Sequence, residues 1–233
     1  VGSLMALLHK ALMPTLVQTA EGQPALIHTS PFSNIAHGCS SVVADRLALG
    51  YADYVVTEGG FGADQGFEKL MHIKMRSAGM CPSAVVLVAT VRALKSHGGV
   101  PTGSLGHPDP LAVHIGTANL EHMVGIVRSF GLPVVVAINR FPGDTTEEIV
   151  IMQDVAISAG ASAAVTCSPF TEGGSGTIEL AEAVERLSAK EARPEFLYPE
   201  SASLKDKVYA VATKVNGANG CLLYTSPSPR DRG

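Results

Sequence analysis

The sequence has few of the features that mark nucleic-acid-binding or membrane-spanning proteins. Its 233 residues contain 17 Lys and Arg against 21 Asp and Glu, which gives a net charge of −4. Without a basic excess the chain has little with which to neutralise phosphates, so we do not expect a nucleic-acid partner. No apolar run reaches about 20 residues, so we predict no membrane span and no membrane partner.

Cysteine is scarce and widely spaced. Cys39, Cys81, Cys167 and Cys221 form no CxxC motif and no Cys/His ligand pair. This usage is typical of a reducing compartment and not of a disulfide framework or a zinc site. We therefore expect no bound metal on protein ligands and a cytoplasmic location, or an organelle if a transit peptide precedes these residues. A nucleophilic cysteine with a histidine partner stays open as an alternative.

What the sequence does contain is a series of short apolar runs that end in turn signals. In Val134–Asp144, VVVAINRFPGD, five of the first six residues are apolar, and Pro142 and Gly143 close the stretch. Such a run predicts a strand buried on both faces, as in a parallel sheet covered by helices. The other predicted strands are Pro24–His28, Tyr54–Thr57, Ala84–Thr90 and Ala163–Thr166.

Segments with helical spacing lie between and after these strands. We predict a three-layer α/β fold with a mostly parallel sheet of about five strands and helices on both faces. Asp144 is the expected N-cap of the helix after the central strand, with Glu147 three residues further on. The predicted helices are Phe32–Leu49, Gln65–Ser77, Leu111–Phe130, Thr145–Ser158, Thr177–Glu191 and Leu204–Val215.

Several segments near strand ends have residues suited to anions. The loop Glu58–Asp64, EGGFGAD, places three glycines around an aromatic residue, although it lacks GxGxxG spacing. By spacing alone, such a loop is more often a tight turn than a ligand-binding loop. Arg92 and Lys95 follow a predicted strand and could hold a phosphate or be solvated helix charges. His28 and His37 could face a site or cap structure at the surface.

Two aromatic residues follow two consecutive predicted strands. Phe141 and Phe170 lie in exit loops rich in Pro and Gly, 29 positions apart. Ligands of parallel sheets bind beyond the carboxyl ends of the strands. We therefore expect the two rings to converge on one flat ligand.

Taken together, five stretches resemble the formate–tetrahydrofolate ligase family and run in that family's order. The resemblance covers about Leu4 to Gly220 and implies a P-loop-NTPase-like fold with added domains. The stretches are PTLVQTAEGQPALIHTSPFSNIAHGCSSVVAD, DYVVTEGGFGADQGFEK, VVLVATVRALKSHGGV, GLPVVVAINRFPGDT and EGGSGTIELAEAV.

The resemblance implies an ATP-dependent activity in one-carbon metabolism. ATP phosphorylates formate, and a nitrogen of tetrahydrofolate attacks the formyl phosphate to give 10-formyltetrahydrofolate. Implied cofactors are ATP as co-substrate, Mg2+ and a monovalent cation, and the implied parent enzyme is a homo-oligomer. By resemblance, the folate-binding residues are Phe141, Pro142 and Phe170, and the residues near nucleotide and formyl phosphate are Gly60, Phe61, Gly62, Asp64 and Asn139.

The resemblance also carries departures. Phe170 stands where the family often has Trp, which keeps a stacking face and loses the indole N–H. The family's P-loop, with its Lys and Thr, is expected before residue 1, so the chain resembles an internal fragment that we expect to be inactive alone. No GxxxxGK[ST] motif occurs in the printed sequence.

We expect three regions along the chain. Residues 1–98 form the C-terminal part of a nucleotide-binding α/β region, residues 99–220 a folate-binding α/β region, and residues 221–233 a disordered tail foreign to the family. The alternative function is a non-catalytic, GTPase-like nucleotide-binding module. Its NKxD signature fails here, because Asn139 is followed by Arg140, Phe141 and Pro142.

Overall fold

The computed structural model describes residues 1–29, 32, 36–190 and 192–220. The chain divides into two compact units, Val1–Glu195 and Phe196–Gly233, which we describe separately. The division predicted near residue 98 concerns ligand binding and stays a prediction. The predicted tail, residues 221–233, lies outside the described residues.

A three-stranded parallel sheet forms the centre of the first unit. Its strands are β3 (Val85–Ala89), β4 (Val134–Asn139) and β5 (Ala163–Cys167), in the order β3-β4-β5. The register pairs Ala89 with Ile138 and Asn139 with Cys167. From Val134 to Ile138 every residue of β4 is buried, as expected for a strand with neighbours on both edges and helices on both faces. The predicted α/β class with a parallel sheet is confirmed.

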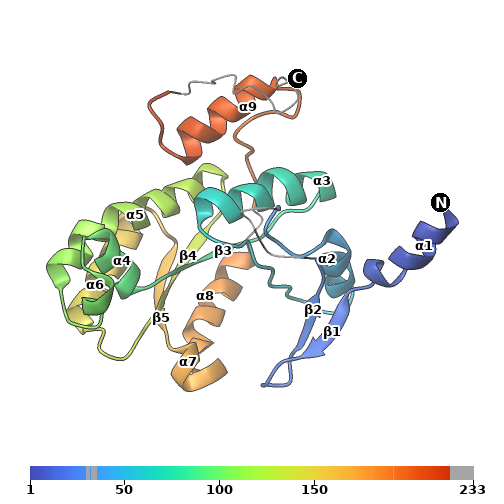
Figure 1. Cartoon of the computed structure of the whole chain (residues 1–233). Coiled ribbons are helices and arrows are strands. Elements are labelled where there is room, and N and C mark those ends of the chain that lie inside the picture. The colour runs from blue at the N-terminus through green and yellow to red at the C-terminus, as the bar shows by residue number, and fades with distance from the viewer. Residues whose placement is uncertain (30–31, 33–35, 191, 221–233) are drawn as a thin grey trace. The chain divides into compact units, whose positions relative to one another are not determined.

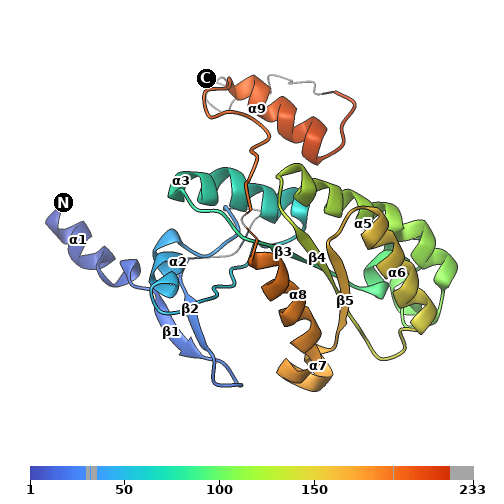
Figure 2. The same ribbon diagram turned by 180° about the vertical axis from the view of Figure 1, so that it is seen from behind.

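Helices cover both faces of this sheet, as Figures 1 and 2 show from opposite sides. On one face Val135 and Val165 pack against Ala183 of α8 (Ile178–Ser188). The other face carries α5 (Pro110–Ser129) and α6 (Thr146–Ser158), and α4 (Val91–His97) packs closely on α5.

Glycines allow the close packing of α4 on α5. A Cβ on Gly116 would collide with the backbone of Leu94, and one on Gly98 with the backbone of Ala112. The two helices can therefore approach at backbone distance only where these side chains are missing. This packing fixes the first turn of α4, which follows β3 directly.

The N-terminal part departs from the predicted five-stranded sheet. β2 (Pro24–Ile27) pairs antiparallel with β1 (Thr15–Gln18) in a separate two-stranded sheet. The predicted strand Tyr54–Thr57 is wrong, since this segment is irregular and Val56 is 93% exposed. Near it the structure has one isolated bridge, between Cys39 and Gly59. A short apolar run needs a neighbouring strand to supply its backbone partners, and in the described part this run has none.

The remaining helices of the first unit lie mostly where periodicity predicts them. Of the predicted helix Phe32–Leu49, residues 33–35 lie outside the described residues and residues 36–41 are not helical. The helix is present from Val42, where Ser41 caps it by accepting a hydrogen bond from the Ala44 N–H at 3.0 Å. The predicted helix Gln65–Ser77 is largely π-helical. The other elements are α1 (Gly2–Leu8), α2 (Val42–Leu49), π-helical Ala63–Phe67 and Leu70–Met75, α3 (Arg76–Ala78), α7 (Pro169–Glu172), and 3-10 turns at Lys10–Leu12, Thr102–Ser104 and Gly173–Thr177.

The second unit contains α9 (Leu204–Ala210), continued by π-helical Val211–Val215. Ser203 caps α9 by accepting a hydrogen bond from the Asp206 N–H at 3.2 Å. Lys214 Nζ donates to the Leu197 carbonyl at 3.0 Å and ties the helix to the preceding connector. The predicted helix Leu204–Val215 is thus confirmed in extent.

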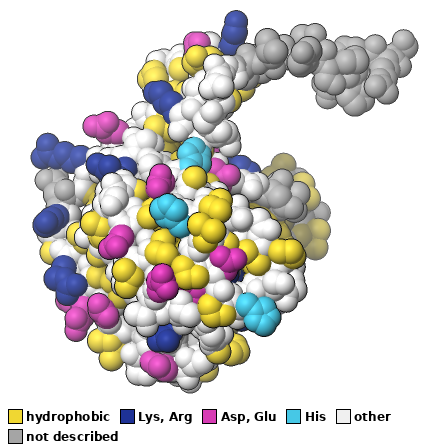
Figure 3. Space-filling model, turned by 90° about the vertical axis from the view of Figure 1, so that its left-hand side faces the viewer, with side chains coloured by type: hydrophobic (Ala, Val, Ile, Leu, Met, Phe, Trp, Pro, Cys, Tyr) yellow, Lys and Arg dark blue, Asp and Glu magenta, His cyan; other side chains and the backbone are white. Residues whose placement is uncertain are grey.

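The surface over α4, α5 and α6 shows no concentration of one residue type. Figure 3 shows acidic, basic, histidine and apolar side chains interspersed on that face. No helix among the described residues is long and apolar enough to cross a membrane.

Candidate functional site

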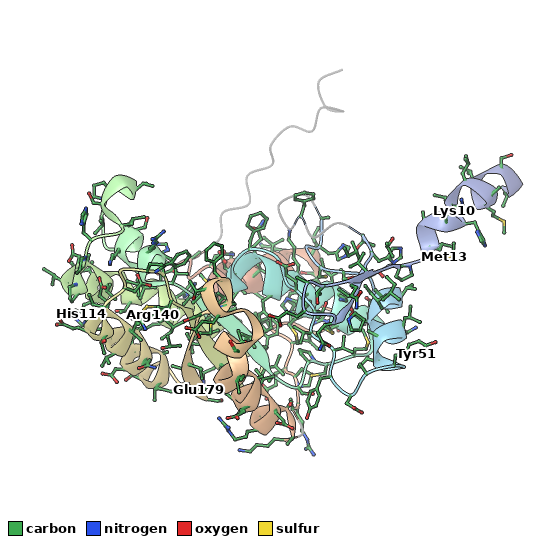
Figure 4. The ribbon with its side chains drawn as sticks, turned by 90° about the horizontal axis from the view of Figure 1, so that it is seen from below. Lys10, Met13, Tyr51, His114, Arg140 and Glu179 are labelled. Atoms are coloured by element: carbon green, nitrogen blue, oxygen red, sulfur yellow. The ribbon has the colours of Figure 1, made fainter. Side chains whose placement is uncertain are left out.

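The carboxyl edge of the parallel sheet gathers the residues expected to bind folate. β3, β4 and β5 end side by side, so the segments that leave them at Thr90, Arg140 and Ser168 share one edge. Figure 4 looks at the molecule from this side and labels Arg140, directly after β4. The arrangement is the one in which open parallel sheets bind ligands.

Hydrogen bonds of the backbone N–H groups stabilise the turn after β4. The Arg140 N–H donates to the Cys167 carbonyl at 2.9 Å, which extends the pairing with β5 by one residue. The Phe141 N–H donates to Asp144 Oδ2 at 2.8 Å, and the Asp144 N–H donates back to the Phe141 carbonyl at 3.1 Å. Gly143, at the bend, has a φ of 96°, which favours glycine. The backbone of Phe141 and Pro142 is therefore held in one conformation.

The predicted N-cap at Asp144 is wrong by one residue. Thr145 caps α6, and Glu148 completes a capping box by accepting from the Thr145 N–H at 2.9 Å. Asp144 is buried and its carboxylate closes the turn at Phe141 instead. The acidic residue belongs to the candidate site, whereas the sequence assigned it to the helix.

Arg92 lies against the ring of Phe141. Its guanidinium carbon is 4.4 Å from the ring centroid, a cation–π geometry. Arg92 is in the first turn of α4, directly after β3, so neighbouring strands supply the two partners. The phosphate contact suggested for Arg92 from sequence stays untested, and its neighbour in the structure is an aromatic ring.

Lys95, one turn after Arg92, is neither solvated nor free to meet a phosphate. Its Nζ is 2.7 Å from Glu148 Oε1, and both side chains are completely buried. The same Nζ donates to the carbonyls of His107 at 2.8 Å and Leu105 at 3.4 Å. Glu148 Oε1 also accepts from the Asp109 N–H at 2.8 Å. The ion pair thus ties α4, α6 and the loop before α5 into one unit.

The pKa of Glu148 reflects two opposing effects. Burial by itself raises the pKa, because the charged form is poorly solvated. Hydrogen bonds from the Asp109 backbone, the Lys95 side chain and Thr145 outweigh it and lower the pKa below the ordinary value of 4.5. Glu148 is therefore ionised when the fold is intact at neutral pH, which completes the pair with Lys95.

Phe170 is presented to solvent on the neighbouring exit loop. It lies in α7, after β5, and is 91% exposed. The Ser168 N–H donates to the Gly176 carbonyl at 2.9 Å and closes the loop behind it. The structure thus places Phe141, in a turn, and Phe170, in α7, in segments that leave adjacent strands at the same edge. That the two rings sandwich one ligand stays a prediction.

The glycine loop at residues 58–64 forms a second cluster, against α5. Gly60 is buried and its N–H donates to the Gly38 carbonyl at 2.7 Å. A Cβ on Gly66 would collide with the backbone of Gly60, so the loop and the following helix touch through their backbones. Phe61 has a φ of 62°, which is rare for a residue with a side chain and often marks a functional position.

The expected nucleotide residues divide between these two places. Gly60, Phe61, Gly62 and Asp64 belong to the glycine loop, where a Cβ on Gly62 would lie 3.6 Å from Met123 Sδ of α5. Asn139 ends β4, two residues before Phe141. Its Oδ1 is buried and has no hydrogen-bond partner among the described residues. A buried acceptor in that state calls for a water or a ligand.

The alternatives involving histidine and cysteine receive little support. His28 Nδ1 lies 2.6 Å from Ser41 Oγ, and His28 Nε2 lies 2.7 Å from the Ala11 carbonyl oxygen. The ring therefore links these neighbouring segments. Burial raises the pKa of the Cys39 and Cys167 thiols, which disfavours the nucleophilic thiolate. Among the described residues no three His, Cys, Asp or Glu side chains cluster as metal ligands.

Sequence reasoning missed the long-range partners at this edge. Arg92 and Phe141 are 49 positions apart and Lys95 and Glu148 are 53 apart, beyond the reach of periodicity. The spacing of Thr145 and Glu148 was a usable signal, since it fits the capping box better than Asp144 and Glu147 do.

Fold and candidate site together define an α/β protein of the parallel-sheet class. The particular family follows from comparison with known proteins. The family model of formate–tetrahydrofolate ligase matches residues 1–228, and the chain belongs to this family.

Curated relatives carry the same family name. The chain is 47% identical over 230 residues to formate–tetrahydrofolate ligase of Desulforamulus reducens, an alignment that covers 95% of this chain and 41% of the relative. It is 51% identical to the Methylobacterium radiotolerans ligase, covering 96% and 40%, and 52% identical to that of Roseiflexus sp., covering 98% and 42%. The chain thus spans about two-fifths of the length of these relatives.

Proposed function

We propose that this chain provides the folate-binding edge, and part of the nucleotide site, of an ATP-dependent formate–tetrahydrofolate ligase. The observation that carries the proposal is the family match across residues 1–228. The geometry supports it, because Phe141, Pro142 and Phe170 all lie in segments that leave adjacent strands at one sheet edge. A flat pterin ring would stack on these rings at about 1 kcal/mol per face beyond its area burial.

The proposed reaction proceeds in two balanced steps. A formate oxygen attacks the γ-phosphorus of ATP, ADP leaves, and formyl phosphate forms. The N10 nitrogen of tetrahydrofolate then attacks the formyl carbon, the C–O bond to phosphate breaks, and the nitrogen's proton passes to the released phosphate. Little acid–base chemistry is needed, so the protein acts mainly by positioning the reactants and stabilising charge.

The glycine loop and Asn139 would serve the nucleotide and formyl-phosphate side. Gly60 and Gly62 let the backbone come close to an anion, and Phe61 and Asp64 complete the loop. Mg2+ bound with the nucleotide would supply positive charge that offsets the charge of the phosphates, as in phosphoryl transfer generally. By resemblance we also propose a monovalent cation, a cytoplasmic or organellar location and a homo-oligomeric complete protein.

Ligand binding to the 233-residue chain and catalysis by a full-length protein that carries it test the proposal together. Isothermal titration calorimetry measures dissociation constants for reduced tetrahydrofolate and for Mg–ATP. We expect Phe141→Ala to weaken tetrahydrofolate binding several-fold, because a stacking face is lost. Binding of Mg–ATP should stay nearly unchanged. Tyr51→Ala is the matched control, since Tyr51 is 88% exposed and lies on a different segment.

Catalysis is read as product that depends on all three substrates. The full-length protein should form ADP, phosphate and 10-formyltetrahydrofolate only when formate, ATP and tetrahydrofolate are all present. A full-length protein that turns over none of them overturns the function. Weakened ATP binding in Phe141→Ala, with tetrahydrofolate binding intact, overturns the assignment of the folate edge.

A further inference from the structure

The proposed function gives no role to the contact between Arg92 and Phe141. The guanidinium carbon lies 4.4 Å from the ring centroid, so the cation covers one of the two faces of the ring. A phenyl ring that stacks on a flat ligand needs one face free. The face opposite Arg92 is therefore the one left for the ligand.

Arg92 is held in place without being neutralised. The strand β3 and the Thr90 cap, whose Oγ1 accepts from the Ala93 N–H at 3.1 Å, fix the first turn of α4. Buried Val91 and Leu94 anchor this turn in the core. Arg92 Nε is buried and makes no hydrogen bond to the described residues. Its contact with Phe141 is thus the main interaction that the described structure offers its charge.

Lys95, on the same helix, is a cation with a structural role, and its surroundings differ from those of Arg92. It is completely buried and its ammonium meets the Glu148 carboxylate and two carbonyls. Arg92, in contrast, has no carboxylate partner among the described residues and contacts the face of the Phe141 ring. Two cations one turn apart on one helix therefore have different surroundings, and only Arg92 borders the proposed folate site.

We propose that Arg92 is a positioning residue for the folate substrate, acting through Phe141. The guanidinium fixes the orientation of the ring and closes one of its faces, so that a planar heterocycle stacks on the other face. The backbone turn at Asp144 fixes where the Phe141 Cα lies, and Arg92 fixes how the ring is turned. The inference rests on the proposed function, because it takes the ligand at Phe141 to be the pterin.

Neutral and charged replacements of Arg92 test the inference in the chain and in the full-length protein. Arg92→Met keeps much of the side-chain volume and removes the cation, and we expect it to weaken tetrahydrofolate binding about three- to tenfold. Arg92→Lys retains a cation and should lose about threefold or less. Neither variant should change the dissociation constant for Mg–ATP, and in turnover the KM for tetrahydrofolate should rise more than kcat falls. Arg186→Met is the matched control, since Arg186 lies on α8 with its side chain 66% exposed and belongs to no segment of the candidate site.

A double-mutant cycle separates positioning from direct ligand contact. In a Phe141→Leu background, which removes the aromatic face, Arg92→Met should cause little further loss of tetrahydrofolate binding. An undiminished loss in that background, or weaker Mg–ATP binding in Arg92→Met, overturns the inference and makes Arg92 a direct ligand contact. Thermal midpoints verify folding, and if Arg92→Met does not fold, the cycle with Arg92→Lys decides.

The outcomes also separate this inference from the proposed function. If Phe141→Ala weakens tetrahydrofolate binding while Arg92→Met and Arg92→Lys leave it unchanged, the function stands and the role of Arg92 is wrong. If Phe141→Ala has no effect on tetrahydrofolate, the folate assignment itself fails, and the Arg92 inference fails with it.

Discussion

The strand β4 and the hairpin of β1 and β2 are both apolar in sequence, yet their side chains end in opposite environments. From Val134 to Ile138, β4 is at most 1% exposed. In the hairpin, Leu16 is 68% and Ile27 is 58% exposed, and no residue of either strand is buried. Burial thus depends on whether neighbouring strands and two layers of helices surround the run, and apolar composition alone does not supply them.

Charged pairs show the same contrast. Lys95 and Glu148 are completely buried at 2.7 Å, with further hydrogen bonds to both groups. Arg186 and Glu182, on α8, are 3.8 Å apart with side chains 66% and 60% exposed. The first pair is a structural junction between helices, whereas an exposed pair of the second kind contributes little to stability.

The largest expected effect comes from placing the same charge in the two apolar strands. Val136→Asp puts an unpaired carboxylate into the buried centre of β4, and we expect a loss of more than about 4 kcal/mol, enough to unfold the chain. Leu16→Asp, at an exposed position of β1, should change stability by less than about 0.5 kcal/mol. Urea unfolding followed by circular dichroism measures both. Equal losses in the two variants would show that the hairpin is as tightly packed as β4.

Breaking the buried ion pair should cost somewhat less. Lys95→Met leaves Glu148 as an unpaired buried charge, for which we expect a loss of about 3–5 kcal/mol in the free energy of unfolding. Arg186→Met breaks the exposed pair and should cost at most about 1 kcal/mol. The same urea titration compares them, and a small effect of Lys95→Met would mean that water reaches Glu148.

These contrasts also show how far the sequence leads. The runs at β3, β4 and β5 were predicted correctly, because each is a short apolar run that ends in turn signals and pairs with a parallel neighbour in the sheet. Tyr54–Thr57 has the same local apolar character and forms no strand, since pairing requires partners distant in the chain. The position of Phe141 at a strand end was predictable from Pro142 and Gly143. Arg92 above its ring was not, because the contact arises from strand order.

A pH dependence should separate the buried carboxylate from the exposed one. The folded-state pKa of Glu148 is lowered from 4.5, so its ionised form stabilises the fold above about pH 4.5. That stabilisation is lost as the pH falls below this value and through the folded pKa. In Glu148→Gln the free energy of unfolding should fall less steeply as the pH is lowered. The difference in this free energy between the variant and the parent chain should therefore narrow toward low pH. Urea midpoints from pH 7 to pH 3 measure this, with Glu182→Gln, at a side chain 60% exposed, as the surface control. A gap between Glu148→Gln and the parent chain that stays constant with pH would contradict the assignment.

The smallest expected effect compares the two aromatic residues of the candidate site. Phe141 is part-buried beneath Arg92, whereas Phe170 is 91% exposed on α7. Because Phe170 packs on little, Phe170→Trp should shift the free energy of unfolding by less than about 0.5 kcal/mol.

A larger indole offers more stacking area, so Phe170→Trp should hold tetrahydrofolate affinity or improve it by about two- to threefold. Phe170→Ala should weaken tetrahydrofolate binding without changing Mg–ATP binding, which links the exposed ring to the same ligand as Phe141. Calorimetric dissociation constants for both ligands provide the measurement. If Phe170→Trp and Phe170→Ala both leave tetrahydrofolate binding unchanged, Phe170 faces solvent in the complex as well, and Phe141 alone forms the platform.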